Sequence, residues 1–193
     1  MHHANRCFWE YVRKTYDNYF QDEIIEFGSY DINGSIRDTL NTNAKEYIGV
    51  DWRPGPKVDL VSLAHEVKFD KKFKAIVSAS MLEHDPHWET SLRNMASLIK
   101  EDGILVLTWG AALNASHCLN EAPDGKFHSL KVEKVTNLLK ELGFCITILV
   151  YDANLNKILG FNVSGTTGEI NLAAFNTKQK VIHLDEIVPE DRI

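Results

Sequence analysis

Short apolar runs rich in β-branched residues alternate with longer amphipathic stretches along this chain, and the alternation predicts a layered α/β domain. We expect strands at Glu23–Ser29, Glu46–Trp52, Val58–Leu63, Ala75–Ser80, Ile104–Trp109, Phe144–Tyr151 and Glu169–Phe175. The link between the last two strands is rich in Asn and Gly and has no convincing helical pattern, which indicates a hairpin. The sheet is therefore expected to be mostly parallel, with an antiparallel last strand.

Apolar residues recur at helical spacing in His87–Lys100 and Leu130–Leu142, and Gly103 and Gly143 follow as plausible helix stops. Residues Asn5–Phe20 form a weaker amphipathic helix that could lie across the sheet. A length of 193 residues with 44% hydrophobic content suits one globular domain. We expect a single domain over 1–193, with 1–22 as an N-terminal helical extension and 180–193 as a solvated tail.

Charge and hydropathy limit the classes of partner. The formal net charge is −6, which gives no broad electrostatic footprint for a polyphosphate and argues against nucleic acid. No apolar run is long enough to span a bilayer, and the N-terminus lacks the apolar core of a signal peptide, so we expect a cytoplasmic protein without a membrane partner. The three cysteines are far apart, which favours reduced thiols over disulfides or a zinc cluster.

The first expected strand runs into a glycine-containing turn, EIIEFGSYDINGS, at residues 23–35. Gly28 and Gly34 could simply make a tight turn, but a turn after the first strand of an α/β sheet also lets a ligand approach backbone N–H groups. Asp51 ends the next strand, where a carboxylate can accept hydrogen bonds from both hydroxyls of a ribose. The alternative for Asp51 is an ordinary surface charge.

Two cofactor classes fit this turn. The dinucleotide motif GxGxxG requires small residues where the pyrophosphate meets the helix, yet Tyr30 stands in the place of the second glycine. A bulky side chain there blocks the close approach of a pyrophosphate, whereas a ligand of the methionine type carries no phosphate. The turn therefore favours S-adenosylmethionine over NAD, and a nicotinamide-dependent oxidoreductase remains the alternative.

Four segments carry a resemblance to a known family: EFGSYDINGS at 26–35, YIGVDWRPGPKVDLVSLAHEV at 47–67, SASMLEHDPHWETSLRNMASLIKEDGILVLTWG at 78–110 and ELGF at 141–144. In this order and spacing the chain resembles the class I S-adenosylmethionine-dependent methyltransferases of the small type-11-like group. The resemblance implies a Rossmann-like α/β three-layer sandwich whose seven-stranded, mostly parallel sheet has the order 3-2-1-4-5-7-6, with strand 7 antiparallel. It also implies S-adenosylmethionine as cofactor and S-adenosylhomocysteine as product.

The resemblance implies a role for each matching residue. The methionine part of the cofactor would be surrounded by Glu26, Gly28, Ser29, Tyr30 and Asn33, although Glu26 could instead cap the turn. Asp51 would bind the ribose and Trp52 would flank the adenine. Ala64 and His65 would lie at the adenine edge, and Ser80 and Met81 would border the sulfonium. Leu63 stands where such proteins often place an acid near the adenine amine.

Methyl transfer requires alignment of the acceptor and sometimes a base, and histidine suits that role near neutral pH. His84 follows the fourth expected strand, but Glu83-His84-Asp85 could also cap the next helix. His117 and His128 are further catalytic candidates. The histidines and Cys118 show no compact ligand spacing, so no metal site is expected.

The segment Gly110–His128 follows the fifth strand and is expected to form the acceptor side of the pocket and part of its cover, with a plain surface loop as the alternative. Trp109 is expected to line the pocket. The chain has SASM after the fourth strand rather than an NPPY-like tetrapeptide, and it has no Pro-Cys pair, which argues against methylation of nucleic-acid bases. A small molecule, a sugar or a protein side chain remain as acceptors, and an inactive cofactor-binding module remains as another possibility.

Overall fold

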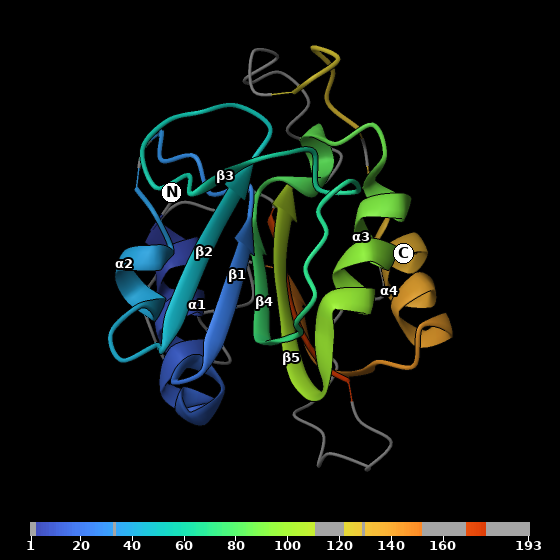
Figure 1. Cartoon of the computed structure of the whole chain (residues 1–193). Coiled ribbons are helices and arrows are strands. Elements are labelled where there is room, and N and C mark those ends of the chain that lie inside the picture. Colours follow the sequence, from blue (N-terminus) through green and yellow to red (C-terminus); the bar gives the residue numbers. More distant parts are fainter. Residues whose placement is uncertain (1–2, 33, 111–121, 129, 152–168, 177–193) are drawn as a thin grey trace.

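A seven-stranded sheet organises the protein, whose computed structural model describes residues 3–32, 34–110, 122–128, 130–151 and 169–176 (Figure 1). The strands are β1 (Glu23–Phe27), β2 (Glu46–Asp51), β3 (Leu60–Val61), β4 (Phe73–Ala79), β5 (Ile99–Gly110), β6 (Cys145–Tyr151) and β7 (Glu169–Phe175). Their order is β3-β2-β1-β4-β5-β7-β6, and β7 is antiparallel to both of its neighbours. The predicted fold class, strand order and antiparallel strand are confirmed.

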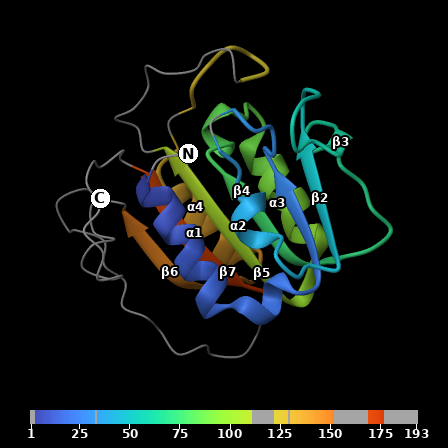
Figure 2. The same cartoon turned by 90° about the vertical axis from the view of Figure 1, so that its left-hand side faces the viewer.

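Helices cover both faces of the sheet, which explains why its central strands are apolar along their length. On one face α3 (Trp88–Leu98) and α4 (Val132–Glu141) bury Leu92, Met95 and Leu139. The other face is covered by α1 (His3–Thr15), the 3₁₀ turn η1 (Asp17–Phe20) and α2 (Arg37–Leu40) (Figure 2). The result is the predicted three-layer sandwich.

The N-terminal helix is an integral part of the second face. Phe8, Trp9 and Val12 of α1 are almost completely buried and pack in one cluster with residues of the sheet. Figure 2 shows α1 lying across the strands, as the sequence predicts for Asn5–Phe20. The stretch is divided at Thr15, and the aromatic ring of Tyr16 then packs edge-on against Phe175 of β7.

Two boundary predictions need correction. Strand β5 begins at Ile99, directly after α3, so Gly103 lies inside the strand rather than ending a helix. A side chain at Gly103 would meet Ile99 and the carbonyl of Lys74, so close packing between strands requires the glycine. Strand β3 contains only Leu60–Val61, which pair with Val50 and Asp51 of β2, and is therefore shorter than the predicted Val58–Leu63. Gly143, by contrast, has a positive φ of 89° just after α4 and is the predicted helix stop.

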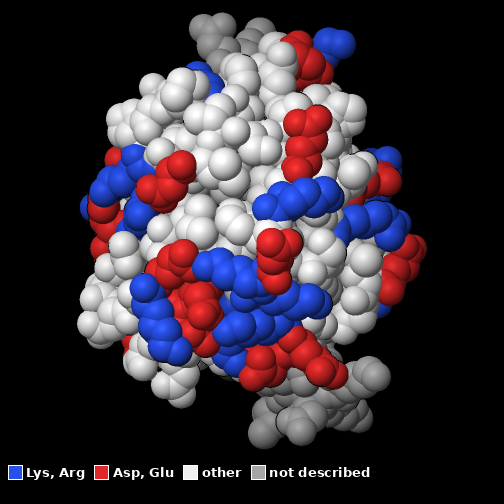
Figure 3. Space-filling model, in the orientation of Figure 1, with Lys and Arg blue, Asp and Glu red and all other residues white. Residues whose placement is uncertain are grey.

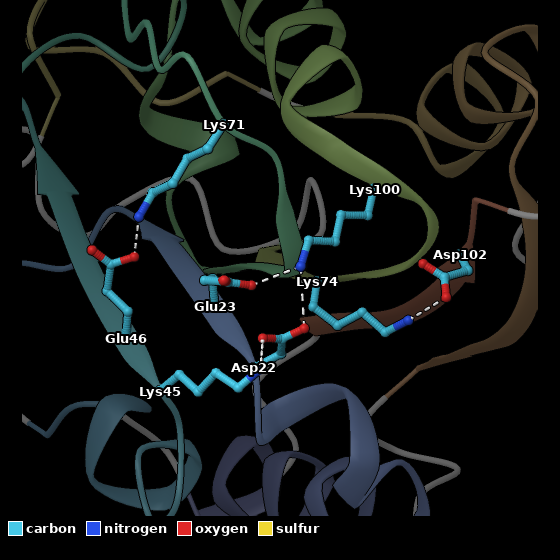
Figure 4. Close-up of polar contacts among 8 residues, drawn as sticks. All are labelled: Asp22, Glu23, Lys45, Glu46, Lys71, Lys74, Lys100 and Asp102. Carbon is cyan, nitrogen blue, oxygen red and sulfur yellow. Dashed lines mark hydrogen bonds and ion pairs between the residues drawn. The ribbon is translucent and has the colours of Figure 1, made fainter.

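Charged side chains gather at the edge of the sheet where the parallel strands begin (Figure 3). We call Asp22, Glu23, Lys45, Glu46, Lys71, Lys74, Lys100 and Asp102 the charged band (Figure 4). Lys100 reaches Glu23 at 2.7 Å and Asp22 at 3.1 Å, and Lys74 reaches Asp102 at 2.6 Å. Lys45 pairs with Asp22 at 2.9 Å, and Lys71 pairs with Glu46.

Among the described residues, no helix is both long and apolar enough to cross a membrane.

Candidate functional site

The turn after β1 brings the backbone of one strand close to the next. Gly28 has a φ of 80°, a conformation that is strained for residues with a Cβ, and its N–H donates to the carbonyl of Val50 at 2.8 Å. A Cβ at this position would lie 2.5 Å from the Cβ of Met81, in the segment after β4. The glycine therefore lets the ends of β1, β2 and β4 converge.

Asp51 ends β2 and points its carboxylate toward this turn. Its side chain accepts the backbone N–H of Tyr30 on Oδ2 and that of Arg53 on Oδ1, each at 3.2 Å. The residue is buried, and burial raises the pKa of the carboxyl although the two backbone hydrogen bonds oppose the shift. Because each carboxylate oxygen has two lone pairs, both oxygens can accept a further hydrogen bond.

The tyrosine that replaces the second glycine of a dinucleotide motif is turned against the neighbouring loop. The guanidinium of Arg53 lies 4.3 Å from the centroid of the Tyr30 ring and 5.5 Å from that of Trp52. Gly55 packs so closely against the Tyr30 ring that a Cβ on residue 55 would lie 1.8 Å from a ring carbon. The Tyr30 ring is thus held between the guanidinium of Arg53 and the backbone of Gly55.

Glu26 is a second buried carboxyl at the same edge. It is 3% exposed, and the hydroxyl of Tyr47 donates to its Oε2 at 2.7 Å. Burial raises the pKa of Glu26 to about 8, while the Tyr47 hydrogen bond and the charge of Arg37 partly oppose this shift. Burial therefore favours the protonated form of the Glu26 carboxyl.

These groups line one cavity of about 200 Å³ at the edge where the parallel strands end. Nine of the eleven predicted cofactor residues line it: Glu26, Gly28, Ser29, Tyr30, Asp51, Trp52, Ala64, Ser80 and Met81. His65 is not in its described lining, because the ring lies against His87 with centroids 4.6 Å apart. Asn33 lies outside the described residues.

The segment after β4 contributes His84, the predicted catalytic histidine. It lies at the end of η2 (Leu82–His84), is 6% exposed, lines the cavity and packs edge-on against the ring of Phe127. Helix α3 has His87 as its N-cap and no side-chain cap hydrogen bond, so the alternative capping role of Glu83-His84-Asp85 is not seen. The carboxylate of Asp85 accepts the N–H of His87 at 2.8 Å and the hydroxyl of Ser91. Glu83 points elsewhere: its Oε1 accepts the N–H of Gly110 at 2.8 Å, and its carbonyl accepts the N–H of His128 at 2.6 Å.

The other catalytic candidates fare differently. The ring of His128 lies 3.1 Å from Asp124 and is not part of the described cavity lining. His117 and residues 111–121 of the expected acceptor segment lie outside the described residues, although Pro123 of that segment lines the cavity.

The prediction for Trp109 is wrong, because this side chain is completely buried in the core under α3 and α4, where its Nε1–H donates to the carbonyl of Leu130. Within the described ranges, no cluster of three or more His, Cys, Asp or Glu side chains could hold a metal ion.

Comparison with known proteins identifies this architecture. No family model and no curated protein sequence matches the chain. Among solved structures, it is similar to an S-adenosylmethionine-dependent methyltransferase from Clostridium acetobutylicum, with a TM-score of 0.65, 12% identity and coverage of 88% of this chain and 91% of the other. The chain has the class I S-adenosylmethionine-dependent methyltransferase fold.

Two further structures show the range of proteins with this fold. The 1,6-didemethyltoxoflavin-N1-methyltransferase of Burkholderia thailandensis, with bound S-adenosylhomocysteine, has a TM-score of 0.66 at 11% identity, over 91% of this chain and 79% of the other. The N-methyltransferase NodS of Bradyrhizobium japonicum has a TM-score of 0.59 at 16% identity, over 88% and 97%. The first is named for 1,6-didemethyltoxoflavin and the second for no particular acceptor, so the fold alone does not identify an acceptor.

Arg53 and Asn5 are among the lining residues of the cavity that the sequence analysis missed. Arg53 directly follows Trp52, which was predicted to flank the adenine, but no sequence motif pointed to Arg53 itself. Asn5 comes from α1, far from the other lining residues in the sequence, and its Nδ2 donates to Oγ1 of Thr108 in β5 at 3.3 Å. Only the position of α1 across the sheet could have indicated it.

Proposed function

We propose that this protein binds S-adenosylmethionine in the cavity at the carboxyl edge of the sheet and transfers its methyl group to an acceptor. The observation that carries the proposal is Asp51, a buried carboxylate that ends β2 and faces a turn opened by a positive-φ glycine. In an open α/β sheet, ligands bind outside the carboxyl ends of the strands at this point.

The cavity fits the parts of this cofactor. The two oxygens of Asp51 can each accept one ribose hydroxyl beside their backbone partners. Ser29 offers a buried hydroxyl with no hydrogen-bond partner among the described residues, and Glu26 offers a carboxyl that a cationic amine would help to ionise. The half-exposed ring of Trp52 and the side chains of Leu63 and Ala64 offer apolar contacts for a nucleobase.

When bound, S-adenosylmethionine supplies an electrophilic methyl group. In the transfer, a bond forms between the acceptor atom and the methyl carbon while the carbon–sulfur bond breaks, which leaves a neutral thioether. Met81 and Ser80 would border this reaction, and Ser80 adopts a strained φ of 52°. His84 is the candidate to accept the proton that a hydroxyl or ammonium acceptor loses, because it is buried in the cavity wall.

The acceptor is proposed to be a small molecule, a sugar or a protein side chain. A nicotinamide-dependent oxidoreductase is not supported by the comparisons, and the Tyr30–Arg53 stack also opposes pyrophosphate binding. An inactive cofactor-binding module would have the same Asp51 and the same turn. Turnover assays distinguish it from an enzyme, with His84→Ala, His117→Ala and His128→Ala as variants that should lower turnover more than cofactor affinity.

Titration calorimetry with S-adenosylmethionine, S-adenosylhomocysteine and NAD tests the cofactor. We expect binding of the first two and none of NAD. Asp51→Ala should weaken binding about ten- to hundredfold for each ribose hydrogen bond that is lost, because a hydrogen bond to a charged group is worth about 1.5–3 kcal/mol. Asp102→Ala is the matched control, since it removes a surface carboxylate from the charged band at the opposite edge. Unchanged affinity in a folded Asp51→Ala protein, or tight binding of NAD, would contradict the proposal.

A further inference from the structure

Among the three described carboxyl groups that line the cavity, Glu26 has the fewest hydrogen-bond donors. Asp51 accepts two backbone N–H groups, and Asp85 accepts one backbone N–H and one side-chain hydroxyl. The Glu26 carboxyl accepts a single hydrogen bond from the described residues, which comes from the hydroxyl of Tyr47 at 2.7 Å on Oε2. Its other oxygen, Oε1, therefore has capacity for a donor from a ligand.

Arg37 of α2 is close enough to act on Glu26 through its charge, but its guanidinium is bound to other groups. Its Nη1 donates to the carboxylate of Asp59 at 2.8 Å, and its Nη2 donates to the carbonyl of Tyr47 at 3.0 Å. Within the described part of the chain, Arg37 forms its ion pair with Asp59 and not with Glu26. Burial of a carboxylate without a paired cation is costly, so the neutral acid is favoured at Glu26.

The other charged groups around Glu26 do not supply the missing cation. The negative charges of Asp31 and Asp38 oppose its ionisation. The described lining of the cavity also contains His84 of η2 and Arg53, whose guanidinium lies over the rings of two neighbouring aromatic residues. Helix α1 and strand β4 contribute no ionisable side chain to this lining. A positive charge on a ligand would therefore supply what the Glu26 carboxylate lacks.

We propose that Glu26 gives up its proton when the cofactor binds and forms an ion pair with the cationic amine of the methionine part. The inference rests on the proposed function, because it takes S-adenosylmethionine as the ligand. The O–H bond of the Glu26 carboxyl breaks, the proton passes to solvent, and the carboxylate pairs with the ammonium group. Tyr47 is the positioning residue for this exchange, because its hydroxyl holds Oε2 and leaves Oε1 for the ammonium group.

The exchange makes cofactor affinity depend on pH. Burial raises the pKa of Glu26 to about 8 in the cofactor-free protein, and an adjacent ammonium group lowers it. Binding below about pH 8 therefore releases a proton, and affinity should rise about three- to tenfold per pH unit between pH 6 and 7. The amine of the ligand keeps its charge in this window, because an α-amino group has an ordinary pKa of about 7.7–8.0.

Titration calorimetry with two ligands counts the released protons. S-adenosylhomocysteine carries the amine, whereas 5′-methylthioadenosine has the same nucleoside and a thioether but no amine. Each is titrated at pH 6.5 in PIPES and in imidazole buffer, whose enthalpies of ionisation differ, so that the difference in heat gives the number of protons. We expect release of about one proton with S-adenosylhomocysteine and almost none with 5′-methylthioadenosine.

The comparison of the two ligands separates Glu26 from Asp51. Both ligands carry the ribose that Asp51 would bind, so a proton released from Asp51 would appear with both of them. Equal release with the two ligands, or no release with S-adenosylhomocysteine, would overturn the inference. This comparison uses the wild-type protein and does not depend on the folding of any variant.

Variants test Glu26 and Tyr47 directly. Glu26→Gln has a similar size but no carboxyl proton, so release with S-adenosylhomocysteine should fall to about zero. Tyr47→Phe removes the donor to Oε2, so affinity for S-adenosylhomocysteine at pH 6.5 should fall about threefold or more, and its rise with pH should move to higher pH. Glu23→Gln is the matched control at the other end of β1 and should leave the proton count unchanged. Undiminished release in a folded Glu26→Gln protein, or an unchanged pH profile in a folded Tyr47→Phe protein, would contradict the assigned roles.

The same titrations distinguish failure of this inference from failure of the proposed function. If S-adenosylhomocysteine binds without releasing more protons than 5′-methylthioadenosine, the proton exchange fails and the proposed cofactor stands. If neither ligand binds, the proposed function fails and this inference fails with it.

Discussion

The two edges of the sheet shift the pKa values of carboxyl groups in opposite directions. At the carboxyl edge, burial raises the pKa of Glu26 to about 8 and also raises the pKa of Asp51. At the other edge, the charged band lowers the pKa of Asp22, chiefly through Lys45, and that of Asp102 through Lys74. One edge favours the ionised carboxylate, and the other penalises it when the cavity is empty.

A single strand connects both environments. Glu23 and Glu26 lie at the two ends of β1, about 10 Å apart. Glu23 forms an ion pair with Lys100, whereas Glu26 has the hydroxyl of Tyr47 and no cation within ion-pair distance among the described residues. The comparison indicates that ion pairs stabilise the carboxylates of the charged band, whereas burial disfavours the ionised form of Glu26.

The largest expected effect is a loss of stability with rising pH that depends on Glu26. Its pKa is about 8 when folded and near 4.5 when unfolded, so the folded state binds the proton more tightly. Stability from this group is therefore fully present below about pH 4.5 and is lost as the pH rises through about 8. The loss should amount to roughly 3–5 kcal/mol, and Glu26→Gln should abolish it.

Urea unfolding of the cofactor-free protein between pH 5 and 8.5 measures this difference. The groups that face Glu26 are Tyr47 and Arg37, with the charges of Asp31 and Asp38 nearby. Glu23→Gln is the matched control, because it makes the same change at the other end of β1 and should leave the pH dependence in place. A slope that persists unchanged in Glu26→Gln would show that Glu26 is already ionised in the folded protein.

A smaller effect is expected from alanine at the two positive-φ glycines, Gly28 and Gly143. Both substitutions strain the backbone, but the new Cβ at Gly28 would also collide with Met81, whereas nothing lies within 4 Å of one at Gly143. We expect a loss of about 2–4 kcal/mol for Gly28→Ala and about 1 kcal/mol for Gly143→Ala. Urea unfolding measures both values, and equal losses would mean that the turn after β1 can move away from Met81.

The smallest effect is expected in the charged band. Asp22→Asn removes the ion pairs to Lys45 and Lys100 and should cost about 1 kcal/mol or less at neutral pH. Because the pKa of Asp22 is lowered in the folded state, this stability is present above about pH 4 and is lost as the pH falls. Thermal unfolding at low and high salt checks it, and a cost that does not shrink in high salt would argue against screened ion pairs.

The sequence predicted those features that depend on local pattern. Strand β7 was predicted at its observed bounds, and the turn after β1 was recognised from Gly28 and the aspartate that ends β2. Contacts between distant segments could not be read in this way. Asn5 and Thr108 are 103 positions apart, and the stack of Arg53 on Tyr30 depends on the fold of two loops. The start of β5 was missed because α3 passes into it without a turn signal.

Glu83 has a consequence for how chains of this kind can diversify. Its side chain accepts the N–H of Gly110 at the end of β5, and its carbonyl accepts the N–H of His128, so one residue anchors two positions that are 18 apart in the sequence. With the ends fixed, doubling the length of such a segment costs only about 0.6 kcal/mol of closure entropy. Insertions and deletions between these anchors should therefore be tolerated by the sheet, so the length of the chain between Gly110 and His128 can vary without disturbing the strands on either side.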